Sequence, residues 1–430
     1  MAEIRAFRAL RYTEKGGDIA KNVCPPYDII SESERQALLA KSPTNIVRLE
    51  LPRGERPYEE AAAALRKLED EKVLSPDAQK GLYIYEEEFD VRGVKNKIKG
   101  LYALVKLREF SDGVVLPHEE TLSKAKADRF ELMSATMCNF SAIYSMYVDE
   151  EHAIRGRMDA LSEGTPDVEF VAADGVVQRL WCVYDPDEIA FFEKAFADKK
   201  LYIADGHHRY ETALNFKKKL IADGVIKDDA HKGNYCMMML ADIDHEGLVV
   251  FPTHRLLRDL EGFDGEAFLA RMKEYFDARK LDSAKELEAA MEKPQDGCVF
   301  GYYDGRGAYL LKKKETPEVE AALREALPGK SDAYRGLDVA VLHSLILEKL
   351  LGIDKENMAN QKNLTYTRDA DEAVRGVDSG DFACCFLLEP TRVRQIKDVA
   401  AAGEKMPQKS TYFYPKLITG LVMNKLTDEE

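Results

Sequence analysis

Apolar and polar positions alternate in short segments that predict both strands and helices along the whole chain. Residues 58–74 carry apolar side chains three and four positions apart, which is the spacing of one buried helix face. Residues 82–89 and 98–107 are strand-like runs on either side of Arg92-Gly93, and this predicts an antiparallel hairpin. Hairpins mixed with helices favour an α+β fold over a doubly wound parallel sheet.

The same pattern predicts the remaining elements and a division of the chain. We expect strands 235–243 and 248–252 to pair with each other, and strands 297–303 and 308–313 to form a hairpin turned at Asp304-Gly305. Composition shifts near residue 260 towards charged helices, so we expect domains 1–258 and 259–430. Other strands are expected at 141–148, 177–183 and 382–388, and helices at 187–196 and 337–351. A helix after residue 205 is expected to bury Tyr210, Ala213, Leu214, Leu220 and Ile221.

Bulk composition disfavours several classes of protein. The 430 residues include 62 Lys and Arg against 77 Asp and Glu, and the formal net charge of −15 disfavours nucleic acid or an anionic membrane as partner. No apolar run is long enough to span a bilayer, and the first residues lack the apolar stretch of a signal peptide. The seven cysteines form no CxxC pair, so no disulfide framework is indicated and a cytoplasmic setting fits best. The oligomeric state is not predicted.

The strongest local signal is the turn that begins at Asp205. An apolar strand-like run ends in Asp205-Gly206, and a helical pattern follows at once, with Asp205 or Gly206 as its N-cap. His207, His208 and Arg209 then occupy the first helical turn, where cationic side chains oppose the helix dipole. A phosphate docked on the first-turn N–H groups would explain this placement.

Each residue of this turn has a proposed role and a competing interpretation. Arg209 suits bidentate contact with phosphate oxygens, and His207 or His208 could donate a hydrogen bond or a proton. An ordinary helix start with solvated histidines is the alternative. We expect no metal here, because adjacent histidines point apart and no nearby Cys or His completes a zinc ligand set.

A second candidate, His118-Glu119-Glu120, follows a short apolar strand. An imidazole and two carboxylates suit a general base or a Mg²⁺ ligand. An acidic loop facing water is the competing interpretation. Just downstream, Lys126 and Arg129 could line an anion pocket or belong to a solvated helix face.

Two further segments carry candidate chemistry. Asp28 follows the rigid turn Pro25-Pro26, and rigidity helps to hold a catalytic base in place, although most such turns are only turns. Lys409, Ser410 and Thr411 offer one cation and two hydroxyls in a proline-flanked loop, which suits recognition of an anion or an amino acid. Packing of the neighbouring tyrosines in the core is the competing account.

Six motifs, in order along nearly the whole chain, resemble a large bacterial and archaeal family, domain of unknown function 1015. They are VCPPYDII, LPHEETLSKAKADRFELM, LYIADGHHRYETAL, FPTHRLL, LDVAVLH and MPQKSTYFYPKLITGLV. The DGHHR turn is also similar to the phosphate-binding turn of the ParB/sulfiredoxin fold. Members with an Asp-Gly-His-x-Arg turn include free-serine kinases, which convert L-serine to O-phosphoserine. The resemblance implies a ParB/sulfiredoxin-like mixed-sheet core with additional α/β domains, and it makes residues 205–209 a phosphate turn.

The residues and the resemblance together favour a phosphotransferase acting on a small hydroxylated metabolite, with L-serine as the best guess. Mg²⁺ and a nucleotide or pyrophosphate donor would take part. Residues 205–209 would hold the phosphate, with His207 a possible proton donor, and Glu119, Glu120 or Asp28 would accept the hydroxyl proton. Substrate contacts are expected from His118, Lys126, Arg129, Lys409, Ser410 and Thr411.

Other functions stay open at this point. The main alternative is a non-catalytic regulatory protein that senses a nucleotide or phosphate through the same turn. Sulfiredoxin-like redox chemistry is disfavoured because that turn needs a cysteine where this chain has His207-His208. ParB-like DNA binding is disfavoured by the negative net charge and by the lack of a clear helix-turn-helix.

Overall fold

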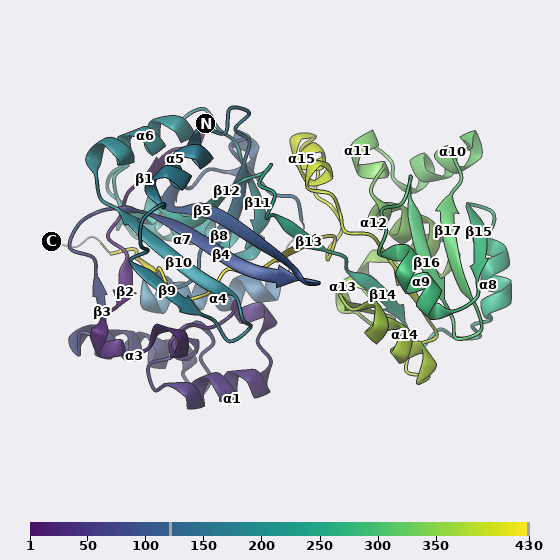
Figure 1. Cartoon of the computed structure of the whole chain (residues 1–430), viewed down its shortest axis with the longest axis horizontal. Helices are drawn as coiled ribbons and strands as arrows, with labels where there is room; N and C mark the ends of the chain where they lie inside the picture. The colour runs from purple at the N-terminus through teal and green to yellow at the C-terminus, as the bar shows by residue number, and fades with distance from the viewer. Residues whose placement is uncertain (120–122, 428–430) are drawn as a thin grey trace. The chain divides into compact units, whose positions relative to one another are not determined.

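The computed structural model divides the chain into two compact units (Figure 1). The first unit comprises Met1–Pro117, Thr121–Val249 and Pro415–Glu430, and the second comprises His118–Glu120 and Val250–Tyr414. The structure describes residues 1–119 and 123–427, so the candidate Glu120 lies outside the described residues. The division falls after residue 249, whereas the pattern predicted a boundary after 258, because strand β14 (His254–Leu257) pairs within the second unit's sheet.

Within its described residues, the first unit is built on a nine-stranded sheet in the order β6-β11-β8-β12-β5-β4-β10-β9, with β1 beside β5. The pairs β6–β11 and β8–β12 are parallel, and the other pairs are antiparallel. The predicted α+β class with a mixed sheet is therefore confirmed. The strands are β1 (Ile4–Arg5), β4 (Leu82–Val91), β5 (Val94–Lys106), β6 (Val115–Leu116), β8 (Ile143–Tyr147), β9 (Val168–Val171), β10 (Val177–Val183), β11 (Leu201–Asp205) and β12 (Tyr235–Asp242).

The hairpin of β4 and β5 is confirmed, and its turn shows why. Val91 pairs with Val94, and both turn residues have positive φ, 54° at Arg92 and 81° at Gly93. That geometry matches the twist of the flanking strands. The expected pairing of 235–243 with 248–252 is wrong, because β12 is enclosed between β8 and β5. The second run forms β13 (Val249–Phe251), which pairs with β20 (Tyr412–Tyr414).

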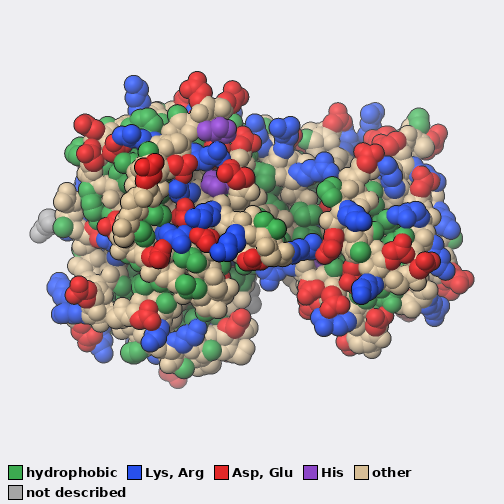
Figure 2. All heavy atoms as spheres, viewed as in Figure 1, with side chains coloured by type: hydrophobic (Ala, Val, Ile, Leu, Met, Phe, Trp, Pro, Cys, Tyr) green, Lys and Arg blue, Asp and Glu red, His purple; other side chains and the backbone are tan. Residues whose placement is uncertain are grey.

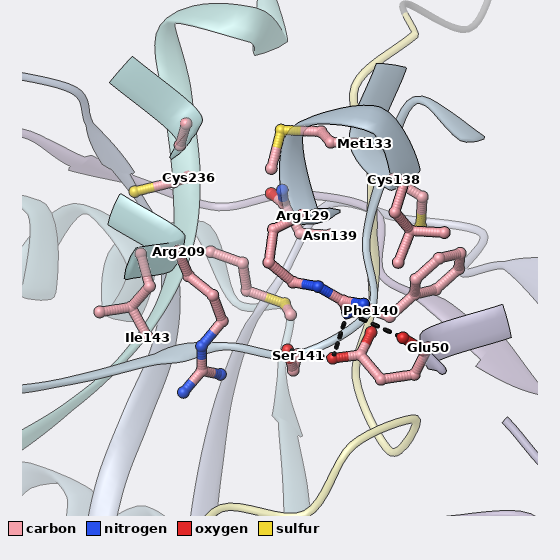
Figure 3. Close-up of a pocket in the computed structure, with 13 residues that line it drawn as sticks. Glu50, Arg129, Met133, Cys138, Asn139, Phe140, Ser141, Ile143, Arg209 and Cys236 are labelled. Carbon is pink, nitrogen blue, oxygen red and sulfur yellow. Dashed lines mark hydrogen bonds and ion pairs between the residues drawn. The ribbon is translucent and has the colours of Figure 1, made fainter. Parts of the chain in front are cut away.

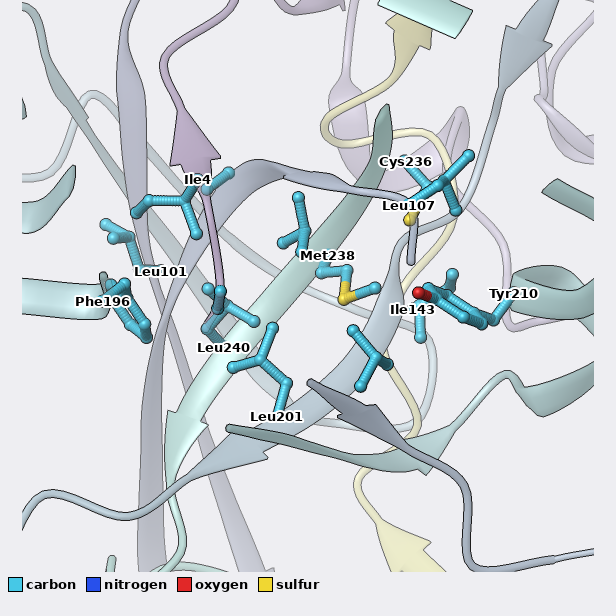
Figure 4. Packing of buried hydrophobic residues seen from close by; sticks show 14 of the residues in the cluster. Ile4, Leu101, Leu107, Ile143, Phe196, Leu201, Tyr210, Cys236, Met238 and Leu240 are labelled. Atoms are coloured by element: carbon cyan, nitrogen blue, oxygen red, sulfur yellow. The ribbon is translucent and has the colours of Figure 1, made fainter. Parts of the chain in front are cut away.

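The main core of the first unit lies between the sheet and the helices packed against it (Figure 4). Helix α6 (Pro186–Phe196) contributes Phe196, and helix α7 (His207–Ala222) contributes Tyr210, against strand residues such as Leu201. The expected buried face of α7 is confirmed except at Ile221, which is 51% exposed. Ile221 lies in the last turn, next to the buried Leu220, and faces solvent.

The other elements of the first unit pack around this core. Helix α1 begins with a capping box made by Ser31 and Glu34. The helices are α1 (Glu32–Lys41), α2 (Val47–Glu50), α3 (Pro57–Asp70), α4 (Ser123–Thr136) and α5 (Ala153–Leu161), with short 3₁₀ helices η1 (Glu14–Gly16), η2 (Ile19–Lys21), η3 (Tyr27–Ile29), η4 (Phe110–Asp112) and η5 (Lys232–Asn234). Two small sheets pair β2 (Leu10–Tyr12) with β3 (Leu74–Pro76) and β7 (Cys138–Asn139) with β21 (Asn424–Lys425). The last pairing returns the C-terminal segment to the first unit.

One buried carboxylate in the large sheet is unusual. Glu87 on β4 is fully buried and accepts a hydrogen bond from Tyr85 Oη at 2.9 Å, while its Oε2 atom has no hydrogen-bond partner. Burial raises the pKa of Glu87 to about 8, outweighing the hydrogen bonds from Tyr85 and Gln178. Glu87 is therefore mostly protonated at neutral pH.

The second unit has an antiparallel sheet of six strands in its described residues, in the order β15-β17-β16-β19-β14-β18. The predicted hairpin of β16 (Val299–Tyr303) and β17 (Ala308–Lys313) is confirmed. The predicted helix 337–351 forms as α12 (Asp338–Val341) running into a π-helix, η6 (Leu342–Leu350). The other elements are β15 (Phe276–Leu281), β18 (Leu364–Thr367), β19 (Cys384–Leu387), α8 (Gly265–Met272), α9 (Ala284–Met291), α10 (Pro317–Ala326), α11 (Asp332–Arg335), α13 (Lys355–Asn360), α14 (Ala370–Asp378) and α15 (Val393–Ala401).

The surface and the thiols agree with the composition. Basic and acidic side chains are interspersed over the visible face (Figure 2). None of the helices in the described residues is both long and apolar enough to cross a membrane. Each of the seven cysteines lies in the described part of the chain and is a free thiol.

Candidate functional site

The predicted helix start after the strand is confirmed. β11 ends at Asp205, Gly206 is the N-cap with φ 96° and ψ 25°, and α7 begins at His207. Glycine is favoured at this backbone conformation because a side chain there is strained. A glycine N-cap also offers no side-chain oxygen to the first-turn N–H groups, which most helix starts receive from Ser, Thr, Asp or Asn.

Asp205 fixes two cations at this turn. Arg209 Nη2 lies 2.7 Å from Asp205 Oδ2, and Lys416 Nζ donates to Oδ1 of the same carboxylate. Arg209 Nη1 also donates to the carbonyl oxygen of Ala142, which holds the guanidinium from a second side. Burial alone would raise the pKa of Asp205, but the charges of Lys416 and Arg209 outweigh it and hold that pKa well below its usual range. Asp205 therefore stays ionised and positions both cations.

The two histidines of the turn differ in burial. His207 is 6% exposed, whereas His208 is partly exposed. The charge of His207 also acts on the carboxyl group of Asp205. The predicted residues 205–209 thus form one compact turn at the end of β11.

A small cavity of about 40 Å³ adjoins this turn in the first unit (Figure 3). Arg209 from α7 and Arg129 from α4 line it together with Glu50 at the end of α2. Arg129 Nη1 donates to the Glu50 carbonyl at 2.7 Å and lies 3.5 Å from its Oε1, and Ser141 Oγ donates to the same Oε1 at 3.1 Å. Burial raises the pKa of Glu50 even though Arg129 and Arg209 lower it.

Asp28 belongs to the same electrostatic cluster. It is exposed on η3, beside Tyr27, whose ring lies 4.1 Å from the Arg129 guanidinium carbon. Burial raises the pKa of Tyr27 to about 12, with the charge of Arg209 lowering it and that of Asp28 raising it. The charge of Asp28 also raises the pKa of Glu50. The charges of Asp28, Arg129 and Arg209 therefore all act on Tyr27 and Glu50.

Two members of this cluster, Glu50 and Lys416, were not predicted as site residues. Lys126 was predicted as one, but its observed partner lies outside the cluster. The only signal for Glu50 was a carboxylate close to the apolar residues Ile46, Val47 and Leu49. Lys416 belongs to the motif MPQKSTYFYPKLITGLV, but it lies 211 residues after Asp205, so no local pattern connects the two. Lys126 is bound to Glu211 at 2.7 Å and is not among the residues that line the cavity.

The remaining candidates gather in the second unit. His118 Nε2 lies 3.0 Å from Thr411 Oγ1, and Glu119 Oε1 accepts the backbone N–H of Lys409 at 2.8 Å. Ser410 Oγ donates to the Pro407 carbonyl oxygen. His118 and Glu119 therefore brace the loop that carries Lys409, Ser410 and Thr411.

No group of three or more His, Cys, Asp or Glu is arranged to hold a metal ion among the residues that the structure describes. A Mg²⁺ ion bound with substrate phosphates needs only one or two protein carboxylates.

Comparison with known proteins gives the family of the chain. The family model described as "Protein of unknown function (DUF1015)" matches residues 4–340. The chain belongs to this family. No curated protein matches it significantly. The family expected from the six sequence motifs is thereby confirmed.

Several solved structures are similar at low sequence identity. A conserved hypothetical protein from Pyrococcus furiosus is 14% identical, with 76% of this chain and 95% of that chain covered and a TM-score of 0.36. A free serine kinase in complex with AMP is 13% identical, with 75% and 90% covered and a TM-score of 0.37. SbnI with a C-terminal truncation, from Staphylococcus aureus, is 10% identical, with 75% and 86% covered and a TM-score of 0.36. These likenesses are remote and carry no functional argument.

Proposed function

We propose that this DUF1015 protein is a phosphotransferase that moves a phosphoryl group from a nucleotide or pyrophosphate to the hydroxyl of a small metabolite, with free L-serine as the favoured acceptor. The observation that carries the proposal is the placement of Arg209. Asp205 and the Ala142 carbonyl oxygen hold its guanidinium in the first turn of α7, next to Lys416. Phosphate at a helix N-terminus is favoured by the N–H groups and by the helix dipole.

The groups at the turn favour an anion. Arg209 and Lys416 both pair with Asp205 at the end of β11. A phosphate placed there would accept hydrogen bonds from the Arg209 guanidinium and from the first-turn N–H groups. Phosphoryl transfer depends mainly on positioning and on charge stabilisation, so a fixed guanidinium is the kind of group that it requires.

Two carboxylates of the first unit are suited to accept the proton of the attacking hydroxyl. Glu50 has a raised pKa, which makes it a stronger base than an ordinary glutamate once it is ionised. Asp28 is exposed and lies within electrostatic range of Tyr27 and Glu50. We assign proton acceptance to one of these two carboxylates, a role worth roughly 10²- to 10⁴-fold in rate. His207 would then serve the phosphate rather than the hydroxyl.

Mg²⁺ would neutralise the donor phosphates when bound, with Asp28 as its protein ligand. In that case Glu50 is the base. The loop of the second unit has by itself the groups that small-molecule recognition uses, because Lys409, Ser410 and Thr411 offer a cation and two hydroxyl groups braced by Glu119 and His118.

The test is incubation of the full chain with L-serine, Mg²⁺ and either ATP, ADP or pyrophosphate, followed by mass spectrometry for O-phosphoserine. Arg209→Gln is expected to abolish the product and to weaken donor binding in calorimetry. Arg66→Gln, on the exposed face of α3, is the matched control and is expected to behave as the wild type. Unchanged donor binding by Arg209→Gln would contradict the proposal.

The same experiment distinguishes phosphoryl transfer from the regulatory alternative. Donor binding that depends on Arg209, without turnover across a panel of amino acids and sugars, would make the protein a phosphate- or nucleotide-sensing binder. The variants Glu50→Gln and Asp28→Asn show which of the two carboxylates accepts the hydroxyl proton. The variant that lowers turnover while donor affinity is retained identifies the proton acceptor.

A further inference from the structure

A second and larger cavity, of about 490 Å³, lies in the second unit at one end of the six-stranded sheet. It is lined by Cys298 from just before β16, by Lys313 from the end of β17 and by Glu389 from just after β19. Asp338 at the start of α12 and Arg392 at the start of α15 complete it. This volume lies within the range of natural small-molecule sites. Neither the phosphate turn nor the loop of Lys409 accounts for it.

The charges in this wall are unequally paired. Lys313 binds Glu315 at 3.1 Å and Glu320 at 2.6 Å, so it is fully engaged. Arg335, another cation of the wall, pairs with Asp332. Among the described residues, Glu389 accepts the backbone N–H of Gln295 at 2.8 Å, and the cation near Asp338 and Glu389 is Arg392, whose Nη2 atom is 4.0 Å from Glu389 and whose side chain is 67% exposed. Two carboxylates facing one solvent-exposed cation leave a place for a second positive charge.

The pKa of Asp338 is affected by its neighbours in this wall. Burial, followed by the nearby charge of Glu389, raises the pKa of Asp338 to about 6, although a hydrogen bond with the Cys298 thiol lowers it. A cation placed between the two carboxylates would remove the repulsion between them.

A buried cation, Arg255, lies next to the same wall. A void of about 10 Å³, enough for one water or one ligand oxygen, shares Asp338, Glu389 and Gln395 with the larger cavity and is also lined by Arg255. Arg255 is 1% exposed, and it donates to the carbonyl oxygens of Thr253 and Lys409, the latter at 3.0 Å.

The Nε atom of Arg255 has no hydrogen-bond partner. Burial lowers the pKa of Arg255 to about 10, against the raising effects of Tyr366 and Glu119. A buried guanidinium with an unused donor calls for an acceptor, and most of all for an anion.

We propose that these adjoining cavities bind a small zwitterion, an α-amino acid, with its carboxylate towards Arg255 and its ammonium group between Asp338 and Glu389. Each end of such a ligand meets a buried or half-buried group of opposite charge that the chain itself leaves undercompensated. The binding is non-covalent and lies within the second unit, so it does not depend on the proposed phosphoryl transfer.

The test is calorimetry on the full chain with each of the common α-amino acids. Two single-ended probes, ethylamine and acetate, accompany them. At least one amino acid is expected to bind, and each single-ended probe is expected to bind at least about tenfold more weakly than that amino acid. Absence of binding by every amino acid, or equal binding by ethylamine, would overturn the proposal.

Variants then place the ligand. Asp338→Asn and Glu389→Gln are each expected to weaken binding at least about tenfold. Asp371→Asn, the same change on the exposed face of α14, should leave the affinity within about twofold and serves as the control. Wild-type binding by both Asp338→Asn and Glu389→Gln would refute this placement.

Discussion

Arg209 Nη2 lies 2.7 Å from Asp205 Oδ2, so the last residue of a strand and the first turn of the following helix are joined across a glycine. The interaction spans four residues, and it directs the guanidinium back over the N-cap instead of into solvent. The orientation of Arg209 therefore depends on the conformation of Gly206 as well as on the ion pair.

Gly206→Ala is expected to lower both stability and donor binding. Gly206 has φ 96°, and an added Cβ would stand 3.0 Å from Arg209 Nε and Nη2. The strain is expected to cost about 1–3 kcal/mol of unfolding free energy, and the displaced guanidinium should reduce donor affinity about tenfold. Urea unfolding and calorimetry measure the two effects.

The control for this change is Gly224→Ala. Gly224 has φ 71°, and a Cβ added there meets nothing within 4 Å. Its stability should fall by a similar amount while donor affinity stays unchanged. Equal loss of affinity in the two variants would show that Arg209 is not positioned through Gly206.

Asp205→Asn is expected to destabilise the first unit by about 3 kcal/mol, because two largely buried cations lose their shared carboxylate. The folded-state pKa of Asp205 is lowered, so its contribution is fully present above the unfolded-state pKa and is lost as pH falls towards the folded-state value. Unfolding free energies of the wild type and Asp205→Asn should therefore converge as the solution is acidified. Asp223→Asn, which removes the exposed partner of Lys219, should show neither effect.

Glu87→Gln is expected to flatten the pH dependence of stability. The pKa of Glu87 is about 8 in the folded chain against an ordinary value of 4.5, so the folded state binds one more proton than the unfolded state between these values. Stability therefore falls as pH rises from 4.5 to 8, by about 1.4 kcal/mol per pH unit from this residue. Urea unfolding at pH 5.5 and pH 8 measures the slope, and Glu59→Gln on exposed α3 should retain it.

Arg129→Met is expected to cost about 3 kcal/mol, because it leaves the buried carboxylate of Glu50 without its nearest cation. The double variant with Glu50→Gln should recover part of this loss, since the unpaired charge is then removed. A double-mutant cycle by chemical unfolding measures the coupling. Strict additivity of the two changes would mean that the pair contributes no interaction energy.

The sequence predicted correctly those elements that depend on a few neighbouring residues. The hairpin of β4 and β5 followed from Arg92-Gly93, and the start of α7 followed from Asp205-Gly206. Asp28, Arg129 and Arg209 were each named as candidates, because each belongs to a distinctive motif. These features depend on short stretches of backbone whose residue preferences are strong.

Interactions between distant segments were beyond the reach of the pattern. Lys416 meets Asp205 only through the return of the C-terminal strand β21 to the first unit, and Glu50 becomes a pocket residue only when α2 meets Arg129 of α4. The pairing expected for 235–243 failed for the same reason. β12 pairs with β5 and β8 instead, and the hydrophobic pattern along the chain does not specify which distant strands pair.

The return of Pro415–Glu430 to the first unit sets an order for biosynthesis. Residues 1–249 can begin to fold while the second unit is still being made, yet Asp205 has only Arg209 as its cation at that stage. The second cation, Lys416, is made only after residues 250–414 of the second unit. The turn at residues 205–209 therefore has both of these cations only after the whole second unit has been synthesised.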